Sequence, residues 1–298
     1  PSQTNMSVSR GKKTGRSLRE KLKAETGNPL VNVVIKATDS SAMAPKSKHI
    51  EALLSFTFNS NVPNPQLATA LIERTQEKSW LPVVKAMTCV HRLIRDGSMD
   101  FFIYLSELPI VFNCSEFHDM SNSEGPVLSK FIQTYNQYLN QKIKLFQKMQ
   151  FDYCHATSNN ELAKLATDAP PRLFKAMDKI LMQMDWILNM VSDDSIVSTL
   201  GNMAVRESGS YLFKDIMRLW LCANTASVNI LERFFKLGEE QAKEALGLME
   251  KFLKHSQRVD TFVQVCMVVG CSEGKEIPPT GEVCTQVYVY VRVDTFVQ

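Results

Sequence analysis

Four side chains in two short segments near the start of the chain could together bind a phosphorylated ligand. Lys36 stands in one segment, and Lys46, Lys48 and His49 stand in the next. Pro45 suits the beginning of a helix, so the later three residues belong to a loop or to a first helical turn. The amides and dipole of a helix N-terminus attract phosphate. With three lysines and a protonatable histidine, the pattern predicts a polyphosphate-binding cluster, and the alternative is an ordinary solvated basic surface.

The remaining residue types that could support catalysis or hold a metal form no recognisable pattern. The seven cysteines are odd in number and widely spaced, which favours reduced thiols. Cys89 and His91 would face different sides of a helix, and Cys154 directly precedes His155, so a Cys/His nucleophile would need distant folding contacts. The sequence has no C-x-x-C pair, phosphate-binding loop or nucleophile elbow. We therefore expect buried cysteines, no metal, no cofactor and no enzymatic activity, and we expect the histidines other than His49 to be structural or surface groups.

The elements that must position the basic cluster are helices. From residue 46 to about residue 263, apolar residues recur at helical spacing, with almost no strand signal. Capping residues, prolines and glycines mark the helix ends: Asn64-Pro65, Ser79, Gly97, Gly125-Pro126 and Pro170-Pro171. Thr38 and Asp39 are also residue types that favour a helix start. The pattern predicts an all-α fold, a right-handed solenoid-like stack of helical hairpins.

The net charge of +3 is distributed unevenly along the chain. Residues 1–49 carry ten basic and three acidic side chains, which gives +7, and the remainder gives 24 − 28 = −4. This asymmetry indicates a polyanionic partner at one end, either nucleic acid or an anionic membrane. Nucleic acid is not expected, because the chain has no recognition-helix signature and no RNP-type aromatics. No apolar run reaches membrane-spanning length and no signal-peptide core is present, which predicts a cytoplasmic protein.

Residues 17–29 have the pattern of a short amphipathic helix. Ser17 and Glu20 have the spacing of a capping box. The candidate membrane-contacting residues are Arg16, Leu18, Arg19, Lys21, Leu22 and Lys23. Because only two leucines share its apolar face, the helix would be marginal alone in water. It would either fold on a membrane surface with its basic side toward the headgroups, or dock on the domain. Residues 1–16 are polar and basic and are predicted to be disordered.

The order of residues around the basic cluster resembles a family signature. Lys36-Ala37-Thr38, seven positions that end at Pro45, and Lys46-Ser47-Lys48-His49-Ile50 resemble the lipid-binding signature of the ANTH domain of clathrin-assembly adaptors. Further stretches are similar to later helices of the family: Asn64-Pro65-Gln66-Leu67-Ala68, Tyr138-Leu139-Asn140-Gln141-Lys142 and Leu212-Phe213-Lys214-Asp215-Ile216. The resemblance covers residues 30–279, which we expect to form one ANTH-like domain.

The resemblance implies a helical domain that binds phosphatidylinositol 4,5-bisphosphate at the inner plasma membrane and links it to clathrin coats in coated pits and vesicles. It assigns headgroup binding to Lys36, Lys46, Lys48 and His49. The family often has further lysines at the positions of Asn32 and Ser47, so a somewhat weaker membrane affinity is expected. The alternative function is a helical scaffold that binds acidic peptides without any lipid dependence.

The end of the chain departs from the family pattern. In full-length relatives a long tail recruits clathrin and the plasma-membrane adaptor complex, so these partners are expected through a tail that is missing here. Some relatives also bind vesicle SNAREs through the last helices. Within residues 280–298, Val287–Val293 alternates like a strand, and Arg292–Gln298 repeats Arg258–Gln264 letter for letter. We therefore assign no fold to this atypical tail, and its departure weakens the expectation of SNARE binding.

Overall fold

The computed structural model describes residues 27–155 and 157–272 and shows no strand in that part of the chain. The first five described helices are α2 (Pro29–Ala37), α3 (Ser47–Phe58), α4 (Asn64–Arg74), α5 (Trp80–Asp96) and α6 (Met99–Glu107). They are followed by α7 (Gly125–Met149), α8 (Asn159–Leu165), α9 (Pro170–Met190), α10 (Asp194–Thr199), α11 (Arg206–Arg233), the 3-10 turn η1 (Phe234–Lys236) and α12 (Glu239–Val269). The all-α prediction is confirmed.

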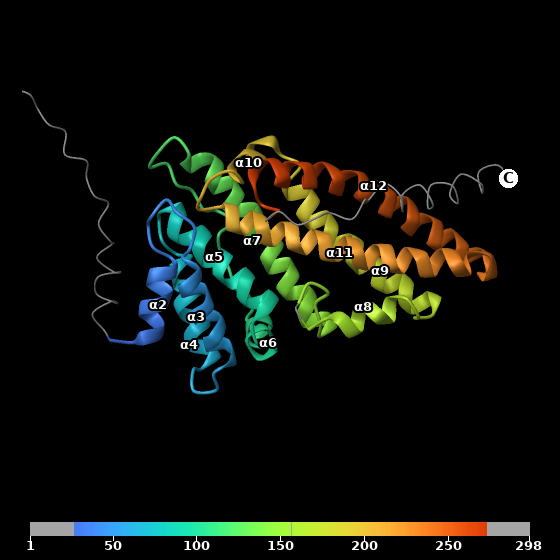
Figure 1. The fold of residues 1–298 in the computed structure, drawn as a ribbon, viewed down its shortest axis with the longest axis horizontal. Coiled ribbons are helices and arrows are strands. Elements are labelled where there is room, and N and C mark those ends of the chain that lie inside the picture. Colours follow the sequence, from blue (N-terminus) through green and yellow to red (C-terminus); the bar gives the residue numbers. More distant parts are fainter. Residues whose placement is uncertain (1–26, 156, 273–298) are drawn as a thin grey trace, which may run out of the picture.

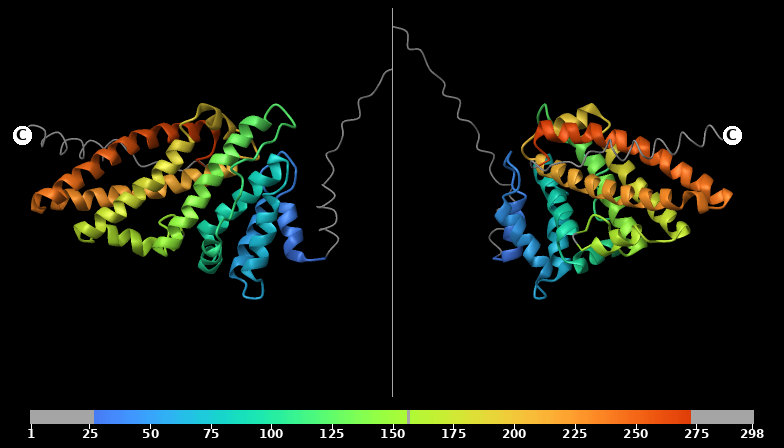
Figure 2. Two further views of the ribbon diagram at one scale, coloured as in Figure 1. Left: turned by 180° about the vertical axis from the view of Figure 1, so that it is seen from behind. Right: turned by 45° about the vertical axis from the view of Figure 1, so that its right-hand side comes forward.

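The helices lie side by side, roughly in chain order, from α2 at one end to α9, α11 and α12 at the other (Figure 1). The reverse view shows the same succession of layers (Figure 2). At the N-terminal end, α2 packs on α3 and α4, and α5 connects this group to α7. The described helices therefore form an extended stack, and the predicted basic cluster belongs to its N-terminal end.

One continuous apolar core runs through the stack. The middle helices α5 and α7 contribute buried side chains on most of their faces, as expected for elements covered from several sides. Phe102 of α6 stacks on Phe146 of α7 with ring centroids 3.9 Å apart. Each such buried apolar side chain stabilises the fold by about 1.5–3 kcal/mol. The core thus gives the N-terminal helices a rigid backing.

A buried polar cluster joins α5, α7 and α11. The carboxylate of Asp215 lies 2.9 Å from His91 Nε2 and 3.2 Å from Lys142 Nζ, and it also contacts Arg95 and Tyr138. Burial opposes the charged form of Asp215, but Lys142 and Arg95 outweigh it and hold the pKa of this carboxylate well below its usual range. His91 is therefore a structural residue, as predicted.

The sequence placed several helix ends correctly. Ser79 is the N-cap of α5, Gly97 is its C-cap, and α7 begins at Gly125. Asn64 is the first residue of α4 and not its N-cap, which is Pro63. This difference of one residue leaves the faces of α4 as expected.

The expected helix start at Thr38 or Asp39 is wrong. Thr38 is the C-cap of α2, which the periodicity did not predict, and its hydroxyl donates to the carbonyl of Val34 at 2.7 Å. Asp39 lies in the following loop, where its carboxylate accepts a hydrogen bond from the Ser41 hydroxyl at 2.7 Å. Threonine and aspartate can bond to backbone or to near neighbours at either end of a helix, so their types alone did not fix the direction.

Candidate anion-binding site

The structure brings Lys36, Lys46, Lys48 and His49 together at one end of two helices. Lys36 lies in the last turn of α2, Lys46 is the N-cap of α3, and Lys48 and His49 lie in its first turn. The position predicted for the last three residues is confirmed. Partial burial, and then repulsion by Lys48, Lys36 and Lys46, lower the pKa of His49 below its usual value. All three lysines are therefore close enough for their fields to act on this imidazole.

The start of α3 has no side-chain cap. The carbonyl of Lys46 accepts from the amide of His49 at 2.8 Å and from that of Ile50 at 3.3 Å. The amides of Ser47 and Lys48 precede these bonds and point out of the helix start, as helix geometry requires. Helix amides and the helix dipole favour an anion at this point. The α3 cluster, which we define as Lys36, Lys46, Lys48 and His49, thus surrounds an uncapped helix start.

Arg74 of α4 fixes the beginning of the loop between α2 and α3. Its Nε donates to the hydroxyl of Thr38 at 2.8 Å, and an Nη donates to the Thr38 carbonyl at 2.7 Å. Arg74 is only 4% exposed, so these bonds are shielded from water. The end of α2, and with it Lys36, is thereby tied to α4.

Lys85 of α5 fixes the next part of the loop. Its Nζ donates to the Asp39 carboxylate at 2.6 Å, to the Asp39 carbonyl at 2.9 Å and to the Ser41 hydroxyl at 3.1 Å. Burial alone would raise the pKa of Asp39, but the bonds from Lys85 and Ser41 outweigh burial and lower that pKa. Asp39 is the sole acidic residue between positions 29 and 50, and Lys85 engages it.

The lysines of the α3 cluster keep their charge available. Within residues 27–155 and 157–272, none of Lys36, Lys46 and Lys48 forms an ion pair, and all three are exposed. Their heads can move on long flexible stems, so they suit an anionic surface better than a single rigid fork would. The arrangement can bind clustered phosphate groups.

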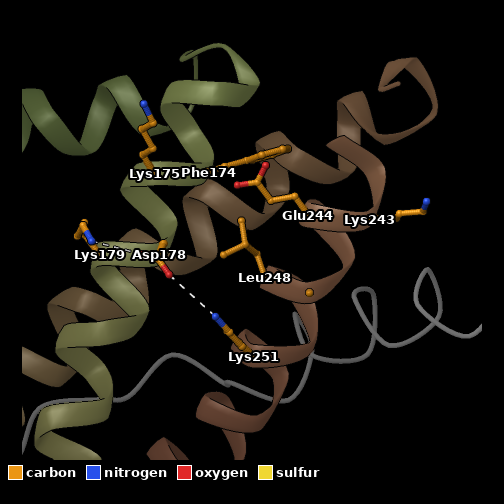
Figure 3. Close-up of a pocket in the computed structure, with 9 residues that line it drawn as sticks. Phe174, Lys175, Asp178, Lys179, Lys243, Glu244, Leu248 and Lys251 are labelled. Carbon is orange, nitrogen blue, oxygen red and sulfur yellow. Dashed lines mark hydrogen bonds and ion pairs between the residues drawn. The ribbon is translucent and has the colours of Figure 1, made fainter. Parts of the chain in front are cut away.

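A second group of lysines surrounds a cavity of about 310 Å³ between α9 and α12 (Figure 3). Phe174 and Leu248 line its apolar part, and the basic residues around it are Lys175, Lys179, Lys243 and Lys251. Asp178 lies 3.4 Å from Lys179 and 4.0 Å from Lys251. Figure 3 shows Lys175 and Lys243 pointing away from each other. These lysines therefore do not converge on one ligand position.

The start of α12, next to this cavity, is already supplied with negative charge. Its first turn contains Glu239 and Glu240, and Lys243 lies 2.8 Å from the first of them and 3.3 Å from the second. Acidic side chains in the first turn already interact with the helix dipole, so a bound anion would gain less from it. The α3 cluster, and not the α9–α12 cavity, is therefore the candidate anion-binding site.

Sequence reasoning did not identify Arg74 or Lys85 as residues that support the site. Lys85 follows Val83 and Val84 in a helix whose residues are mostly buried. Because a lysine is almost never fully buried without a partner, its place in this apolar stretch could have indicated one. The partner itself, Asp39, is 46 positions away and could not be named. The other candidate membrane residues, Arg16, Leu18, Arg19, Lys21, Leu22 and Lys23, lie outside the described residues, as does the strand-like Val287–Val293.

The described cysteines are buried and free. Burial raises the pKa of Cys114 to about 11 and that of Cys222 to about 12, which keeps these thiols protonated and unreactive at neutral pH. Across residues 27–155 and 157–272, no three histidine, cysteine, aspartate or glutamate side chains gather as a metal site would require. No helix in that part of the chain is both long and apolar enough to cross a bilayer.

The described helices define the class of the protein, an extended all-α stack that presents exposed lysines and an uncapped helix start at one end. Comparison with known sequences specifies the family: the ANTH domain profile matches residues 30–285. The chain belongs to the ANTH domain family.

Several clathrin assembly proteins are similar to this chain. The human clathrin coat assembly protein AP180 is 35% identical over 269 residues, which is 89% of this chain and 29% of that protein. The human phosphatidylinositol-binding clathrin assembly protein is 34% identical over 89% of this chain and 40% of its own length. The LAP protein of Drosophila melanogaster is 32% identical over 89% and 59%, respectively. The chain thus spans between about a third and three fifths of these relatives.

Two solved structures share the fold. The ENTH domain of epsin-2, in complex with phosphatidylinositol 4,5-bisphosphate, superposes with a TM-score of 0.59 at 14% identity and covers 87% of this chain and 97% of that one. Helical ANTH and ENTH tubules on membranes that contain this lipid give a TM-score of 0.64 at 14% identity, with 87% and 98% covered. These similarities confirm an ANTH/ENTH-like helical superhelix.

Proposed function

We propose that this chain binds phosphatidylinositol 4,5-bisphosphate on membranes and serves as an adaptor in clathrin coat assembly. The observation that carries the proposal is the α3 cluster, in which three exposed lysines without ion pairs in the described structure surround an uncapped helix start. The names of the relatives support it, since they are clathrin assembly proteins and some are described as phosphatidylinositol-binding.

In this proposal, one phosphate of the headgroup accepts hydrogen bonds from the amides of Ser47 and Lys48 at the start of α3. Lys36, from α2, and Lys46 neutralise the neighbouring phosphate. His49 takes up a proton when the phosphates approach, because their charge opposes the repulsion that lowers its pKa in the free protein. No covalent step is involved, and we infer a binding protein and not an enzyme.

The wider role is proposed from the relatives. We infer that the protein acts at the inner plasma membrane, in clathrin-coated pits and vesicles, with clathrin and the plasma-membrane adaptor complex as partners through a tail of the kind that longer relatives carry. A vesicle SNARE is a further candidate partner of the late helices. The presence in the matched relatives of more sequence than this chain spans is consistent with additional binding regions.

Vesicle co-sedimentation tests the lipid claim. The protein is mixed with phosphatidylcholine vesicles that contain phosphatidylinositol 4,5-bisphosphate, another phosphoinositide, or phosphatidylserine at equal total charge. We expect preferential binding to the 4,5-bisphosphate. The triple variant Lys36→Glu, Lys46→Glu and Lys48→Glu should lose roughly 100-fold or more in affinity, since each basic residue near an anionic surface contributes about 1 kcal/mol.

Two outcomes would contradict the proposal. Equal binding of the wild type to phosphatidylserine and to 4,5-bisphosphate vesicles, or equal binding of wild type and triple variant to the latter, would show that the cluster recognises no specific headgroup. A pulldown of acidic peptides that survives the triple change and needs no lipid would instead favour the lipid-independent scaffold. Circular dichroism of the triple variant serves as the folding control, because all three lysines are exposed.

A further inference from the structure

The loop that joins α2 to α3 carries an exposed apolar side chain between the cationic positions. From Ser40 to Pro45 the loop has no charged residue, and its largest apolar side chain, Met43, is 54% exposed. Ser41 and Ala42 beside it are exposed as well. The tip of this loop is therefore small and uncharged, and it stands in the sequence between Lys36 and Lys46.

The loop holds this tip in a fixed place. Its first residues are tied by Arg74 to Thr38 and by Lys85 to Asp39 and Ser41, as described above. At its other end Pro45 is buried, directly before the N-cap of α3. Because both ends are anchored, the exposed residues between them must project from the surface. Met43 is therefore presented outward at a defined position.

Chain length places Met43 at the level of the headgroups. Lys46 is three positions further along the chain, and three residue steps span at most about 10 Å. Lysine stems are long and flexible, so the ammonium groups can reach phosphates while a neighbouring apolar side chain enters more deeply. We propose that Met43 inserts into the headgroup–acyl boundary when the α3 cluster binds its lipid. This inference rests on the proposed function and extends it from headgroup capture to penetration of the bilayer.

The contribution of Met43 should be modest and resistant to salt. Complete burial of a methionine side chain contributes about 1.5–3 kcal/mol, and about half of this side chain is still exposed to water, so its loss should weaken vesicle binding roughly threefold to tenfold. Salt screens the lysines but not apolar burial. The relative effect of removing Met43 should therefore persist when ionic strength rises.

Affinity for vesicles of phosphatidylcholine and phosphatidylinositol 4,5-bisphosphate provides the first test. Met43→Ser should weaken binding roughly threefold to tenfold, whereas Met43→Leu, which keeps an apolar side chain, should bind like wild type. Phe58→Ser is the matched control. Phe58 is 64% exposed and ends the same helix, α3, about 16 Å from its start. Its removal should leave affinity unchanged, since it lies at the opposite end of α3.

A fluorescent probe provides the second test. An environment-sensitive dye on Met43→Cys should move to an apolar environment on the same vesicles, while a dye on Phe58→Cys should remain in water. The described cysteines are buried, and labelled wild type measures their background. Soluble inositol 1,4,5-trisphosphate should bind without shifting the dye at position 43, which separates headgroup capture from bilayer insertion.

The results distinguish the two proposals. If wild type binds the vesicles through the lysines but Met43→Ser binds equally well and the dye at position 43 stays in water, insertion is refuted and the lipid-binding function stands. If wild type shows no preference for the 4,5-bisphosphate, the proposed function fails first. An equal effect of Met43→Ser and Phe58→Ser would show general surface stickiness and would also refute the insertion.

Discussion

Lysines gather in two places on this molecule, in the α3 cluster and around the α9–α12 cavity. The cavity has four lysines and an apolar floor, so a count of basic residues would favour it over the three lysines of the α3 cluster. Three of them, Lys179, Lys243 and Lys251, nevertheless lie beside carboxylates, and the adjacent helix start is occupied by Glu239 and Glu240. At the α3 cluster, Asp39, the sole acidic residue between positions 29 and 50, is engaged by the buried Lys85.

The difference shows that the number of lysines does not define a phosphate site. An anionic ligand must compete with every carboxylate that already lies beside a lysine. An exposed ion pair contributes little to stability, but its carboxylate still makes the local electrostatic potential less positive. Free helix amides add directional donors that lysines lack. The α3 cluster combines three lysines without ion pairs in the described structure with such amides, whereas most lysines of the cavity lie beside carboxylates and the adjacent helix start carries two glutamates.

The largest expected contrast comes from reversing one charge in each place. Lys48→Glu should weaken binding to vesicles containing phosphatidylinositol 4,5-bisphosphate roughly 10- to 30-fold, since one attraction is lost and one repulsion is added. Lys251→Glu makes the same change in net charge at the cavity and should alter the affinity less than about twofold. Co-sedimentation at one salt concentration measures both affinities. Equal losses in the two variants would show that the α3 cluster and the cavity contribute alike to lipid binding.

Lys85, which supports the loop before the α3 cluster from inside, should show the next effect when it is replaced. Lys85→Met keeps the length of the side chain but removes three hydrogen bonds to Asp39 and Ser41. It also frees the carboxylate of Asp39 beside the cluster. We expect a loss of about 1–3 kcal/mol in the free energy of unfolding and roughly fivefold weaker vesicle binding. Urea titration and co-sedimentation measure the two effects, and Lys130→Met, at an exposed lysine, is the control.

A gain of affinity should follow when the cluster receives another charge. Ser47 is exposed in the first turn of α3, between Lys46 and Lys48. Ser47→Lys should therefore strengthen binding about fivefold, at about 1 kcal/mol per basic residue near an anionic surface. Ser198→Lys, at an exposed residue of α10, adds the same charge elsewhere. An equal gain from both variants would mean that net charge, and not position, governs affinity.

The smallest predicted effect is a dependence on pH. In the free protein, burial and the neighbouring lysines lower the pKa of His49, so the imidazole is neutral at pH 7.5. Bound phosphates raise that pKa, and the protonated form binds more tightly. Affinity attributable to His49 should thus rise about twofold to threefold as pH falls from about 7.5 toward 5.5, and level off below the pKa of the free protein.

The matched variant for this effect is His49→Gln, which retains polarity without titration. The headgroup phosphates titrate in the same range, so the ratio of wild-type to variant affinity is the quantity that isolates His49. A ratio that stays constant between pH 7.5 and 5.5 would remove His49 from the site.

Local patterns in the sequence were sufficient for the longer helices and for the composition of the α3 cluster. Pro45 and the residues after it mark the start of α3, and Gly125-Pro126 marks the start of α7, because these signals act within one helical turn. The helix α2 was missed, and Thr38 was assigned to the wrong end of a helix. Helix α2 has only nine residues, which are too few turns for a helical period to stand out in the sequence.

The supports of the cluster could not be predicted for a different reason. Arg74 reaches Thr38 across 36 positions and Lys85 reaches Asp39 across 46. Such contacts depend on how α2, α4 and α5 pack, which no local spacing encodes. The same holds for the lysines around the α9–α12 cavity, whose neighbouring carboxylates come partly from another helix. Sequence thus identified the basic residues, and only the fold shows which of them lack counter-charges.

The most direct test of the central claim is a titration of the protein with soluble inositol 1,4,5-trisphosphate, followed by the backbone amide resonances. We predict saturable shifts that are largest at Ser47, Lys48 and His49 at the start of α3, with little change at Gly247 and Lys251 beside the cavity. Shifts that are equal at the two places, or largest along α9 and α12, would contradict the claim that open helix amides and free lysines make the phosphate site.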